Sequence, residues 1–354
     1  MTFLRVALVG CGLISEAHIR AYEHYPERAR ITVCCDLDLE KATQRAEMIA
    51  GAQAVSSLDA VLADPDVDAI EICTPHHLHA DIAIAAARAR KHILCQKPLA
   101  KTLAECDAMI AAAQAAGVVL YYGETNRTMP AAQVMKQAID TGRIGQLTGV
   151  QATYAHWQGG KYLSTAWRYD PRIAGGGQLL DGGIHYIDLM LHMGGPIQSV
   201  SCFTARFRPE LGGEDTAVVN ARFGGGQLGT LFSSQATGVW FPGASFVAFG
   251  TEGVLTLGGP FGGPQSALSL HRADLPDQRT VLLEAHENSF AVMTGHYLDT
   301  VLNGAANPSP GEVGRENLRV VLAAYESARL GREIRLEQIE PRQSDTVRFF
   351  NDKD

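Results

Sequence analysis

The sequence predicts an α/β protein of two domains: a parallel sheet covered by helices, then an α/β domain built on a mostly antiparallel sheet. Its 354 residues exceed the usual size of a single domain. Residues 1–124 alternate short apolar runs with segments that carry apolar residues at helical spacing. From residue 149 onward the pattern changes to longer strands separated by glycine-rich turns.

The first domain is expected to contain a parallel sheet because its strands and helices alternate, which requires right-handed crossovers. Ser57 and Thr102 are suitable N-caps for the helices that follow them. We expect strands at 4–9, 31–35, 69–73, 92–95 and 118–121, and helices at 16–25, 39–50, 78–89 and 103–116.

In the second domain several strands alternate apolar and polar residues, which suits an antiparallel sheet with one covered face. We expect strands at 149–156, 200–207, 217–223, 228–235, 245–250 and 253–257, and helices at 183–192, 289–302 and 311–330. The domains are then residues 1–124 and 125–337, with the last helices able to pack back on the first domain. Residues 338–354 form a polar tail.

Composition and charge exclude several classes of protein. The formal net charge of -8 comes without a basic block, which argues against nucleic acid as a partner. No apolar run approaches the roughly 20 residues of a membrane-spanning helix, and the first residues lack the pattern of a secretion signal. The 7 cysteines form no CxxC pair and no zinc spacing, so we expect reduced thiols and a cytoplasmic protein.

A glycine-rich turn follows the first strand. Gly10 would allow the tight turn, and Gly12 would let the backbone approach a pyrophosphate at the N-terminus of the next helix. Ser15 takes the third place of the GxGxxG pattern, and Asp36 ends the second strand, where a carboxylate would accept the hydroxyls of the adenosine ribose. Together they predict a dinucleotide site of the Rossmann type, against the alternative of an ordinary glycine turn. NAD is favoured over NADP because no arginine neighbours Asp36, although Lys41 keeps NADP open.

Four further segments accompany this turn, in the order TPHHLH at 74–79, QKPLA at 96–100, GRIG at 142–145 and GGGQLLDGGIHYIDL at 175–189. With the glycine turn, the ordered series resembles the Gfo/Idh/MocA family, named for glucose–fructose oxidoreductase and inositol dehydrogenase. The likeness covers residues 3–335. It implies an N-terminal Rossmann domain, a C-terminal α/β domain with a large open sheet, and homodimers or homotetramers packed through that sheet. It also implies an NAD-dependent oxidoreductase that acts on a ring hydroxyl of a sugar, glycoside or cyclitol.

The resemblance also assigns roles to residues. The family's catalytic lysine falls on Lys97, and its Asp-x-x-x-His pair falls on Asp181 and His185. Gln96 stands where the family normally has glutamate, so position 96 supplies no negative charge beside the lysine. The cofactor-binding residues that the pattern and the resemblance together indicate are Gly10, Gly12, Leu13, Ile14, Asp36, Thr74, Pro75, His79, Gln96, Lys97, Asn126, Trp167 and Arg168.

The residue types suit this chemistry in their own right. A lysine at the carboxyl end of a strand could hold the substrate oxygen near nicotinamide C4 and stabilise a developing alkoxide, whereas the alternative for Lys97 is a surface position on a loop. His185 could accept the hydroxyl proton, and Asp181 could orient its ring or bind a neighbouring hydroxyl. The alternative for that pair is a hydrogen-bonded helix start in the core. The roles of the lysine and the histidine could be shared or exchanged.

The substrate pocket is expected in the second domain, where aromatic rings mix with hydrogen-bond donors. Trp157 and Tyr162 could instead cover the sheet or an oligomer interface. His76, His77 and His79 cluster, but hydride transfer with a lysine and a histidine needs no metal, so we expect none. The substrate-binding candidates are Lys97, Arg127, His156, Trp157, Tyr162, Arg168, Asp181 and His185.

Two other interpretations stay open. The same site could belong to a reductase, to an enzyme with a tightly held cofactor, or to a glycosidase that oxidises its substrate transiently. The fold could also serve a non-catalytic regulator that senses a dinucleotide. The joint presence of Lys97, Asp181 and His185 favours an enzyme, because a sensor has no chemical need of them.

Overall fold

The computed structural model describes residues 3–157, 165–208, 210–259, 266–285 and 288–339. The chain divides into two compact units. The first unit comprises Met1–Thr125 with Asn288–Arg315, and the second comprises Asn126–Glu287 with Glu316–Asp354. Between residues 288 and 315 the chain therefore belongs to the first unit, although the boundaries drawn from the sequence counted this segment with the second domain.

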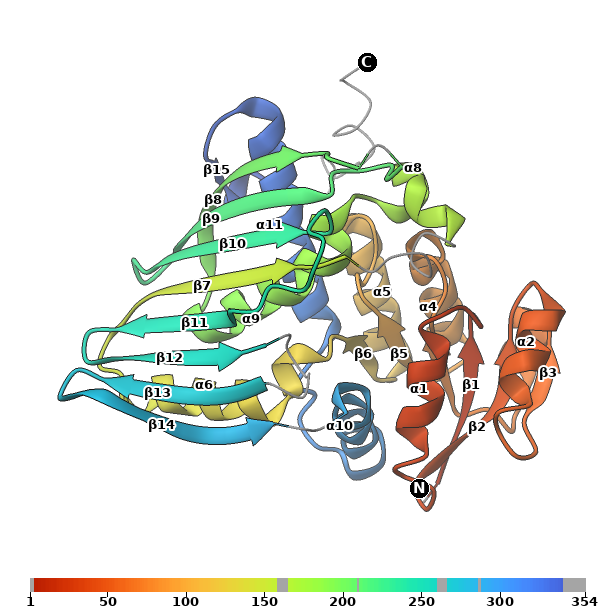
Figure 1. Ribbon diagram of the computed structural model, residues 1–354. Helices are drawn as coiled ribbons and strands as arrows, with labels where there is room; N and C mark the ends of the chain where they lie inside the picture. Colours follow the sequence, from red (N-terminus) through yellow and green to blue (C-terminus); the bar gives the residue numbers. More distant parts are fainter. Residues whose placement is uncertain (1–2, 158–164, 209, 260–265, 286–287, 340–354) are drawn as a thin grey trace. The chain divides into compact units, whose positions relative to one another are not determined.

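The first unit contains a six-stranded sheet of order β3-β2-β1-β4-β5-β6 (Figure 1). Every neighbouring pair is parallel, which confirms the predicted Rossmann arrangement. The short strand β3 was not predicted, because three exposed or half-buried residues carry no apolar pattern. The strands are β1 (Leu4–Val9), β2 (Ala29–Cys35), β3 (Gln53–Val55), β4 (Ala69–Ile72), β5 (His92–Gln96) and β6 (Leu120–Gly123).

Several helices of the first unit begin at a residue whose side chain caps them. The Ser57 hydroxyl accepts a hydrogen bond from the Ala60 amide and the Thr102 hydroxyl accepts one from the Glu105 amide, so both residues are N-caps as predicted. The Glu105 side chain also completes a capping box with Thr102. α1 and α2 end earlier than predicted. The helices are α1 (Ser15–Tyr22), α2 (Leu39–Ala46), α3 (Leu58–Ala63), α4 (His79–Arg88), α5 (Leu103–Ala116) and α10 (Ser289–Asn303), with a 3-10 turn η1 (His76–Leu78).

The second unit contains a nine-stranded sheet of order β14-β13-β12-β11-β7-β10-β9-β8-β15. β7 and β10 run parallel, and the other neighbouring pairs are antiparallel, which confirms a mostly antiparallel sheet. β13, β14 and β15 were not predicted. The strands are β7 (Leu147–Ala155), β8 (Ile197–Ala205), β9 (Thr216–Phe223), β10 (Leu228–Ser234), β11 (Ala244–Gly250), β12 (Gly253–Gly258), β13 (Ser266–Arg272), β14 (Leu275–Ala285) and β15 (Ile334–Arg335).

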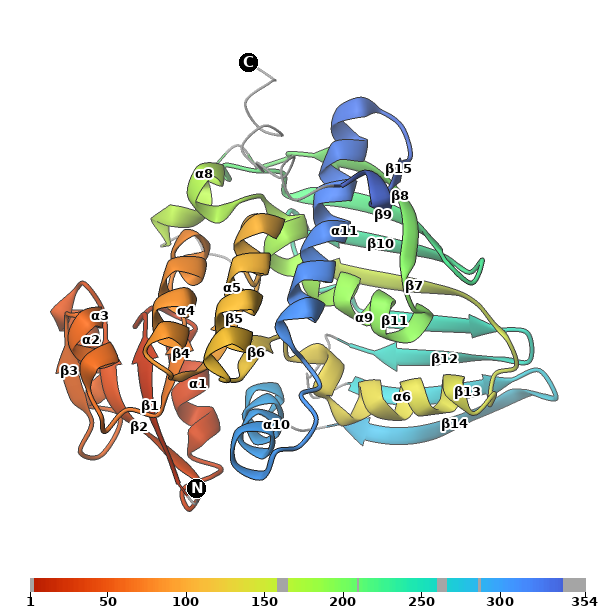
Figure 2. The same ribbon diagram turned by 180° about the vertical axis from the view of Figure 1, so that it is seen from behind.

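Helices α6 and α9 lie over one face of this sheet (Figure 2). α6 was not predicted, and α11 continues from the first unit into the second. Among the helices of the described ranges, none combines the length and apolarity that crossing a membrane requires. The helices are α6 (Pro130–Asp140), α8 (Pro171–Ala174), α9 (Ile184–Gly194) and α11 (Gly311–Leu330), with short turns η2 (Asn126–Thr128), η3 (Ala166–Tyr169) and η5 (Leu336–Gln338) and a π-helical turn η4 (Leu179–Gly183).

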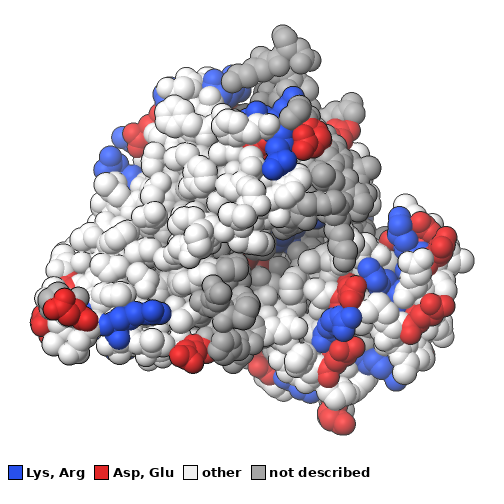
Figure 3. Space-filling view, viewed as in Figure 1, with Lys and Arg blue, Asp and Glu red and all other residues white. Residues whose placement is uncertain are grey.

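The opposite face of the nine-stranded sheet exposes apolar side chains. Phe203, Val218 and Phe232 pair across β8, β9 and β10 and therefore share that face. Phe203 is 72% exposed, and Phe232 and Phe249 are each 38% exposed. Figure 3 shows few charged side chains over these strands. Adjacent exposed apolar side chains of this kind are typical of surfaces that bind another protein.

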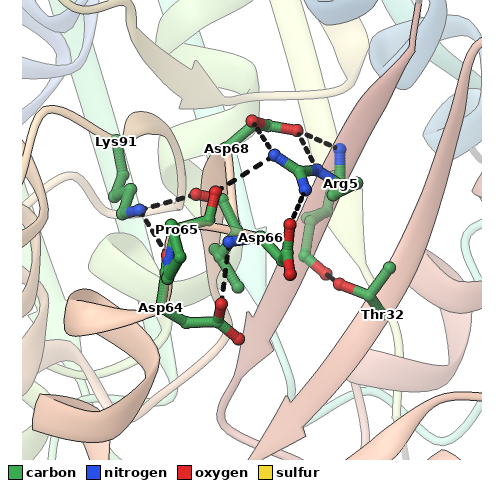
Figure 4. A network of polar contacts seen from close by, with 9 residues as sticks. Arg5, Thr32, Asp64, Pro65, Asp66, Asp68 and Lys91 are labelled. Atoms are coloured by element: carbon green, nitrogen blue, oxygen red, sulfur yellow. Dashed lines mark hydrogen bonds and ion pairs between the residues drawn. The ribbon is translucent and has the colours of Figure 1, made fainter.

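A polar network joins the amino end of β1 to the loop before β4 (Figure 4). The Arg5 guanidinium binds the Asp68 carboxylate, with Nε 2.9 Å from Oδ2. The buried Lys91 ammonium donates to the carbonyls of Asp64 at 2.7 Å and Val67 at 2.6 Å, just beyond the end of α3. The network lies at the amino edge of the sheet, opposite the edge that binds ligands in such folds, so its role is structural.

We expect Lys91→Met to lower the free energy of unfolding by about 1–3 kcal/mol, because it removes the donor for two main-chain carbonyls. Lys41→Met is the control, since its ion pair with Asp38 joins two largely exposed side chains and should cost less than about 0.5 kcal/mol. Urea unfolding followed by far-ultraviolet circular dichroism measures both. Equal effects of the two substitutions would contradict the structural role of Lys91.

Candidate active site

The glycine turn after β1 presses directly on the end of β4. Gly10 has φ +94°, and a Cβ there would lie 2.6 Å from the Cys73 carbonyl carbon. No other residue type fits at position 10. The strand order reverses between β1 and β4 at this point, and only main-chain atoms fill the contact between the turn and the end of β4. A dinucleotide pyrophosphate requires this kind of close backbone approach.

Asp36 follows β2 and faces the glycine turn. Its carboxylate accepts the Cys11 amide at 2.8 Å and the Asp38 amide at 3.0 Å, and the side chain remains half-buried. The neighbouring cations are engaged elsewhere: Lys41 pairs with Asp38 at 3.2 Å, and Arg45 binds the Ser15 hydroxyl at 2.9 Å. Asp36 is thus held as an acceptor, which suits ribose hydroxyls and disfavours a 2′-phosphate.

The residues around this turn fit a bound dinucleotide. Leu13 is 48% exposed and Leu37 is 89% exposed, which is unusual for apolar side chains beside a sheet edge. The Thr74 Oγ1 atom is buried and has no hydrogen-bond partner in the described part of the chain. A ligand or an ordered water at the end of β4 would satisfy this hydroxyl. Gly12, Ile14 and Pro75 line the same edge of the sheet.

His79, a predicted cofactor contact, lies at the start of α4. Its ring is fully buried, with Nε2 3.0 Å from the Thr74 carbonyl and Nδ1 2.9 Å from the Pro98 carbonyl. Burial lowers the pKa of the imidazole, and the two main-chain carbonyls oppose that shift. The ring therefore ties the loop after β4 to the loop after β5, and supports the cofactor edge from beneath.

Lys97 directly follows β5 at the same sheet edge. Its amide donates to Gln96 Oε1 at 3.1 Å, and its side chain is half-buried. Leu99 and Ala100 are fully buried and anchor the loop that continues from it. The predicted position of the lysine at the carboxyl end of a strand is confirmed.

Asp181 and His185 belong to the second unit, on consecutive helical segments. Asp181 lies on the π-helical turn η4, and His185 lies in the first turn of α9. Single π turns inside helices are frequent at functional sites. Asp181 Oδ2 is 3.2 Å from Arg168 Nε, and Arg168 also stacks over Trp167 with its Cζ 4.3 Å from the ring centroid. The aspartate is thereby fixed beside the histidine-bearing helix.

An aromatic group stands at the end of β7. The His156 ring stacks on Trp240 with centroids 4.2 Å apart and 16° between planes, and meets Tyr154 edge-on at 4.4 Å. His156 is fully buried, burial lowers the pKa of its imidazole to about 4, and neither ring nitrogen has a hydrogen-bond partner among the described residues. Trp240 remains 45% exposed. Sequence reasoning missed Trp240, whose only signal is its place in a glycine-bounded loop.

The other predicted substrate residues are scattered. Trp157 lies under the Arg208 guanidinium, 3.6 Å from Cζ to the ring centroid. Arg127 is buried, with Nε 3.2 Å from Asp188 Oδ2, so its charge is neutralised within the second unit. Asn126 is buried on the turn η2, and Tyr162 lies outside the described residues. In the described ranges no three His, Cys, Asp or Glu side chains gather as a metal would need.

Glu214 is a further buried acid that sequence reasoning missed. Its carboxylate accepts the amides of Leu179 at 2.8 Å and Gly177 at 3.1 Å, and the Tyr325 hydroxyl at 2.9 Å. Burial raises the pKa of Glu214 to about 7, against the opposing effect of these donors. The carboxylate braces the segment that leads into Asp181.

A raised carboxyl pKa makes the second unit less stable as pH rises. Between pH 4.5 and about 7 the folded state binds the extra proton, so we expect about 3 kcal/mol of unfolding free energy to be lost across that window. Glu214→Gln should abolish this slope, and the exposed Glu210→Gln should keep it. Tryptophan fluorescence measures it, because all 3 tryptophans lie in the second unit. Equal slopes in wild type and Glu214→Gln would refute the assignment.

We expect Asp36→Ser to weaken NADH binding about 10- to 100-fold, because a charged acceptor for ribose hydroxyls is lost. NADPH binding should hold or improve, since the repulsion of a 2′-phosphate is removed. Fluorescence titration with both dinucleotides measures this, with the exposed Asp59→Ser on α3 as control. Unchanged NADH affinity in Asp36→Ser would contradict the ribose contact.

Comparison with known proteins gives a consistent family. The profile described as "Oxidoreductase family, NAD-binding Rossmann fold" matches residues 4–124, and the "GFO/IDH/MocA C-terminal domain" profile matches residues 132–256. Levoglucosan dehydrogenase of Pseudarthrobacter phenanthrenivorans is 34% identical over 243 residues, which are 65% of this chain and 62% of that protein. The chain thus spans less than two thirds of that relative.

Two further relatives match over nearly their full length. D-apiose dehydrogenase of Paraburkholderia graminis is 27% identical over 94% of this chain and 90% of its own. The solved structure of a levoglucosan dehydrogenase in complex with NADH and levoglucosan superimposes with a TM-score of 0.85 at 25% identity, over 94% of this chain and 99% of that one. The two profile matches together cover well over half of the sequence, so the chain belongs to the GFO/IDH/MocA family of NAD-binding sugar and cyclitol oxidoreductases.

Proposed function

We propose that the protein transfers hydride between a ring hydroxyl of a sugar, glycoside or cyclitol and NAD, with Lys97 and His185 acting at the reacting oxygen. The observation that carries the proposal is the position of Lys97. Its main chain is fixed at the carboxyl end of β5, in the same unit as the dinucleotide turn at Gly10. Ligands of doubly wound sheets bind at this edge.

In this proposal Lys97 stabilises negative charge on the substrate oxygen. Bound nicotinamide supplies the hydride acceptor, or the hydride donor in the reverse direction. A half-buried ammonium that meets the substrate oxygen stabilises the alkoxide character that develops as hydride leaves carbon. The amide of Lys97 already donates to Gln96 Oε1. The main chain at Lys97 is therefore ordered before substrate binds, which lowers the entropy cost of holding the lysine in place.

His185 is the proposed general base, and Asp181 positions it or a neighbouring substrate hydroxyl. The ion pair between Asp181 and Arg168 fixes the aspartate in place. An unprotonated imidazole at the start of α9 can accept the hydroxyl proton. The proton thus passes from the substrate oxygen to the histidine while hydride passes to the cofactor.

The aromatic group at the end of β7 supports a polyhydroxylated ring as substrate. The exposed Trp240 offers a flat apolar surface, and the neutral His156 beside it has one nitrogen donor and one nitrogen acceptor that no described residue engages. Sugar rings present both apolar C–H faces and hydroxyl edges, which match this combination. The names of the relatives, levoglucosan and D-apiose dehydrogenases, agree with that class.

We also propose that the apolar face of the nine-stranded sheet joins copies of the chain as a homodimer or homotetramer. The row of Phe203, Val218 and Phe232 supports it, because a water-exposed row of this kind costs free energy that a second copy would recover. The 7 cysteines are buried and unbridged, as expected of a reducing compartment, and the cytoplasmic location stays a prediction.

The decisive experiment follows NADH formation with NAD and a panel of inositols, aldoses and glycosides. We expect Lys97→Met to lower kcat/KM about 100- to 1,000-fold, the loss typical of removing one electrostatic contact to the transition state. NADH affinity should stay within about threefold of wild type. Lys136→Met is the matched control, because that lysine pairs with Asp140 within α6 and has no proposed catalytic role.

The outcomes separate the competing functions. Turnover that Lys97→Met removes and Lys136→Met retains supports the dehydrogenase. Turnover only from a ketose or glycoside, with cofactor recycled in place, would indicate the reductase or redox glycosidase that uses the same residues. Tight NAD binding without turnover of any panel member would overturn the proposal in favour of a dinucleotide sensor.

A further inference from the structure

A chain of buried polar side chains lies beneath Lys97, and the proposed mechanism does not use it. Glu71 is 1% exposed, His18 is 0% exposed and Gln96 is 5% exposed. They come from β4, α1 and β5, three segments that also carry the dinucleotide turn and the lysine to the sheet edge. A carboxylate buried this deeply in a sheet is costly, so it needs a specific reason to be there.

The three side chains form a continuous hydrogen-bonded path that ends at Lys97. Glu71 Oε1 binds His18 Nδ1, and His18 Nε2 lies 2.7 Å from Gln96 Nε2. Gln96 Oε1 then accepts the Lys97 amide at 3.1 Å. The other carboxylate oxygen, Glu71 Oε2, accepts the Tyr22 hydroxyl.

The direction of each bond follows from its fixed end. The Lys97 amide can only donate, so the oxygen of the Gln96 amide must face it. The nitrogen of the same amide then donates to His18 Nε2, which must be unprotonated to accept. The His18 proton is therefore on Nδ1 and points at the carboxylate of Glu71, which can only accept.

The groups around His18 preserve this proton arrangement. On α1, the Tyr22 hydroxyl stays a donor, because burial and then the Glu71 charge raise its pKa well above the ordinary value. On α10, burial and then the Glu71 charge raise the pKa of Tyr297 in the same way. Phe290, on the same helix, contacts the His18 imidazole edge-on with ring centroids 5.0 Å apart. Directly after β4, burial raises the pKa of the Cys73 thiol, so it stays neutral.

We propose that Glu71 and His18 are positioning residues for Lys97. Glu71 fixes one tautomer of His18, and this tautomer orients the Gln96 amide. The Gln96 amide then holds the Lys97 peptide at the sheet edge. The inference rests on the proposed function in that it assigns the lysine its catalytic place. It explains why position 96 carries an amide, because only an amide of this length can donate to a bare nitrogen and accept from the main chain at once.

A carboxylate at position 96 should break the arrangement. In Gln96→Glu, an acceptor would face the His18 Nε2 lone pair, so the ring must take up a second proton between two carboxylates. We expect the pH profile of kcat in Gln96→Glu to differ from that of wild type, because the His18 ring then carries a second proton. We expect kcat to fall about tenfold and KM for NAD to change less than about threefold, because the lysine moves while the glycine turn does not.

Two substitutions at Glu71 separate its charge from its acceptor oxygen. Glu71→Gln keeps an oxygen for the His18 Nδ1 proton and should hold kcat within about threefold of wild type. Glu71→Met has no acceptor and should lose about tenfold in kcat, with KM for NAD nearly unchanged. Tyr297→Phe is the control, since that buried hydroxyl makes no hydrogen bond to the path.

The test has one arm that needs no turnover. Long-range proton–nitrogen correlation spectra of the full chain, with the His18 signals assigned by their loss in His18→Asn, should find a proton on Nδ1 only, and on both nitrogens in Gln96→Glu. A wild-type proton on Nε2 would overturn the proposal. So would wild-type kcat and pH profile in both Gln96→Glu and Glu71→Met while Lys97→Met is inactive. If Lys97→Met keeps full turnover, the catalytic role of the lysine fails instead, and the spectra still decide the tautomer.

Discussion

The first unit is organised around one buried negative charge. Glu71 sits in β4 with both carboxylate oxygens engaged, one by His18 and one by Tyr22, and both partners come from α1. A desolvated carboxylate is tolerated only when donors surround it, so the position of α1 on the sheet is set by polar bonds as well as by apolar packing. The helix that carries the dinucleotide turn and the strand that carries Lys97 are thereby held by a common group.

The second unit also contains a buried carboxylate, but different donors stabilise it. Glu214 is also fully buried, but its donors are the main-chain amides of Gly177 and Leu179 and one tyrosine hydroxyl, with no histidine. Burial outweighs these donors, so its pKa rises to about 7. Both buried acids stand behind a loop that bears a candidate catalytic residue, Lys97 in one unit and Asp181 in the other. Buried charge here fixes loop geometry, at a cost in stability that ordinary packing must offset.

The fold was predictable where local signals act alone. The turn at Gly10, the acid at Asp36 and the N-cap at Thr102 are short-range patterns, and the structure has each as expected. β14 was missed because its exposed, charged sequence with a proline lacks the alternation of a half-buried strand. The polar path could not be read from the sequence, since Glu71 and His18 are 53 positions apart and each is an isolated polar residue in an apolar pattern. Pairing of that kind is a product of tertiary packing.

The two halves of the candidate site also differ in how far family membership informs them. The dinucleotide half is specified by main-chain geometry, which leaves little freedom at Gly10 or Asp36, so a profile match carries its chemistry with it. The substrate half depends on side chains of strand ends and loops, such as His156 and Trp240, which a shared fold does not determine. Burying an imidazole with neither nitrogen bonded to a described residue costs more than burying an apolar ring of that size. A bound molecule that takes up those nitrogens would offset the cost, which makes His156 the residue through which substrate identity is best sought.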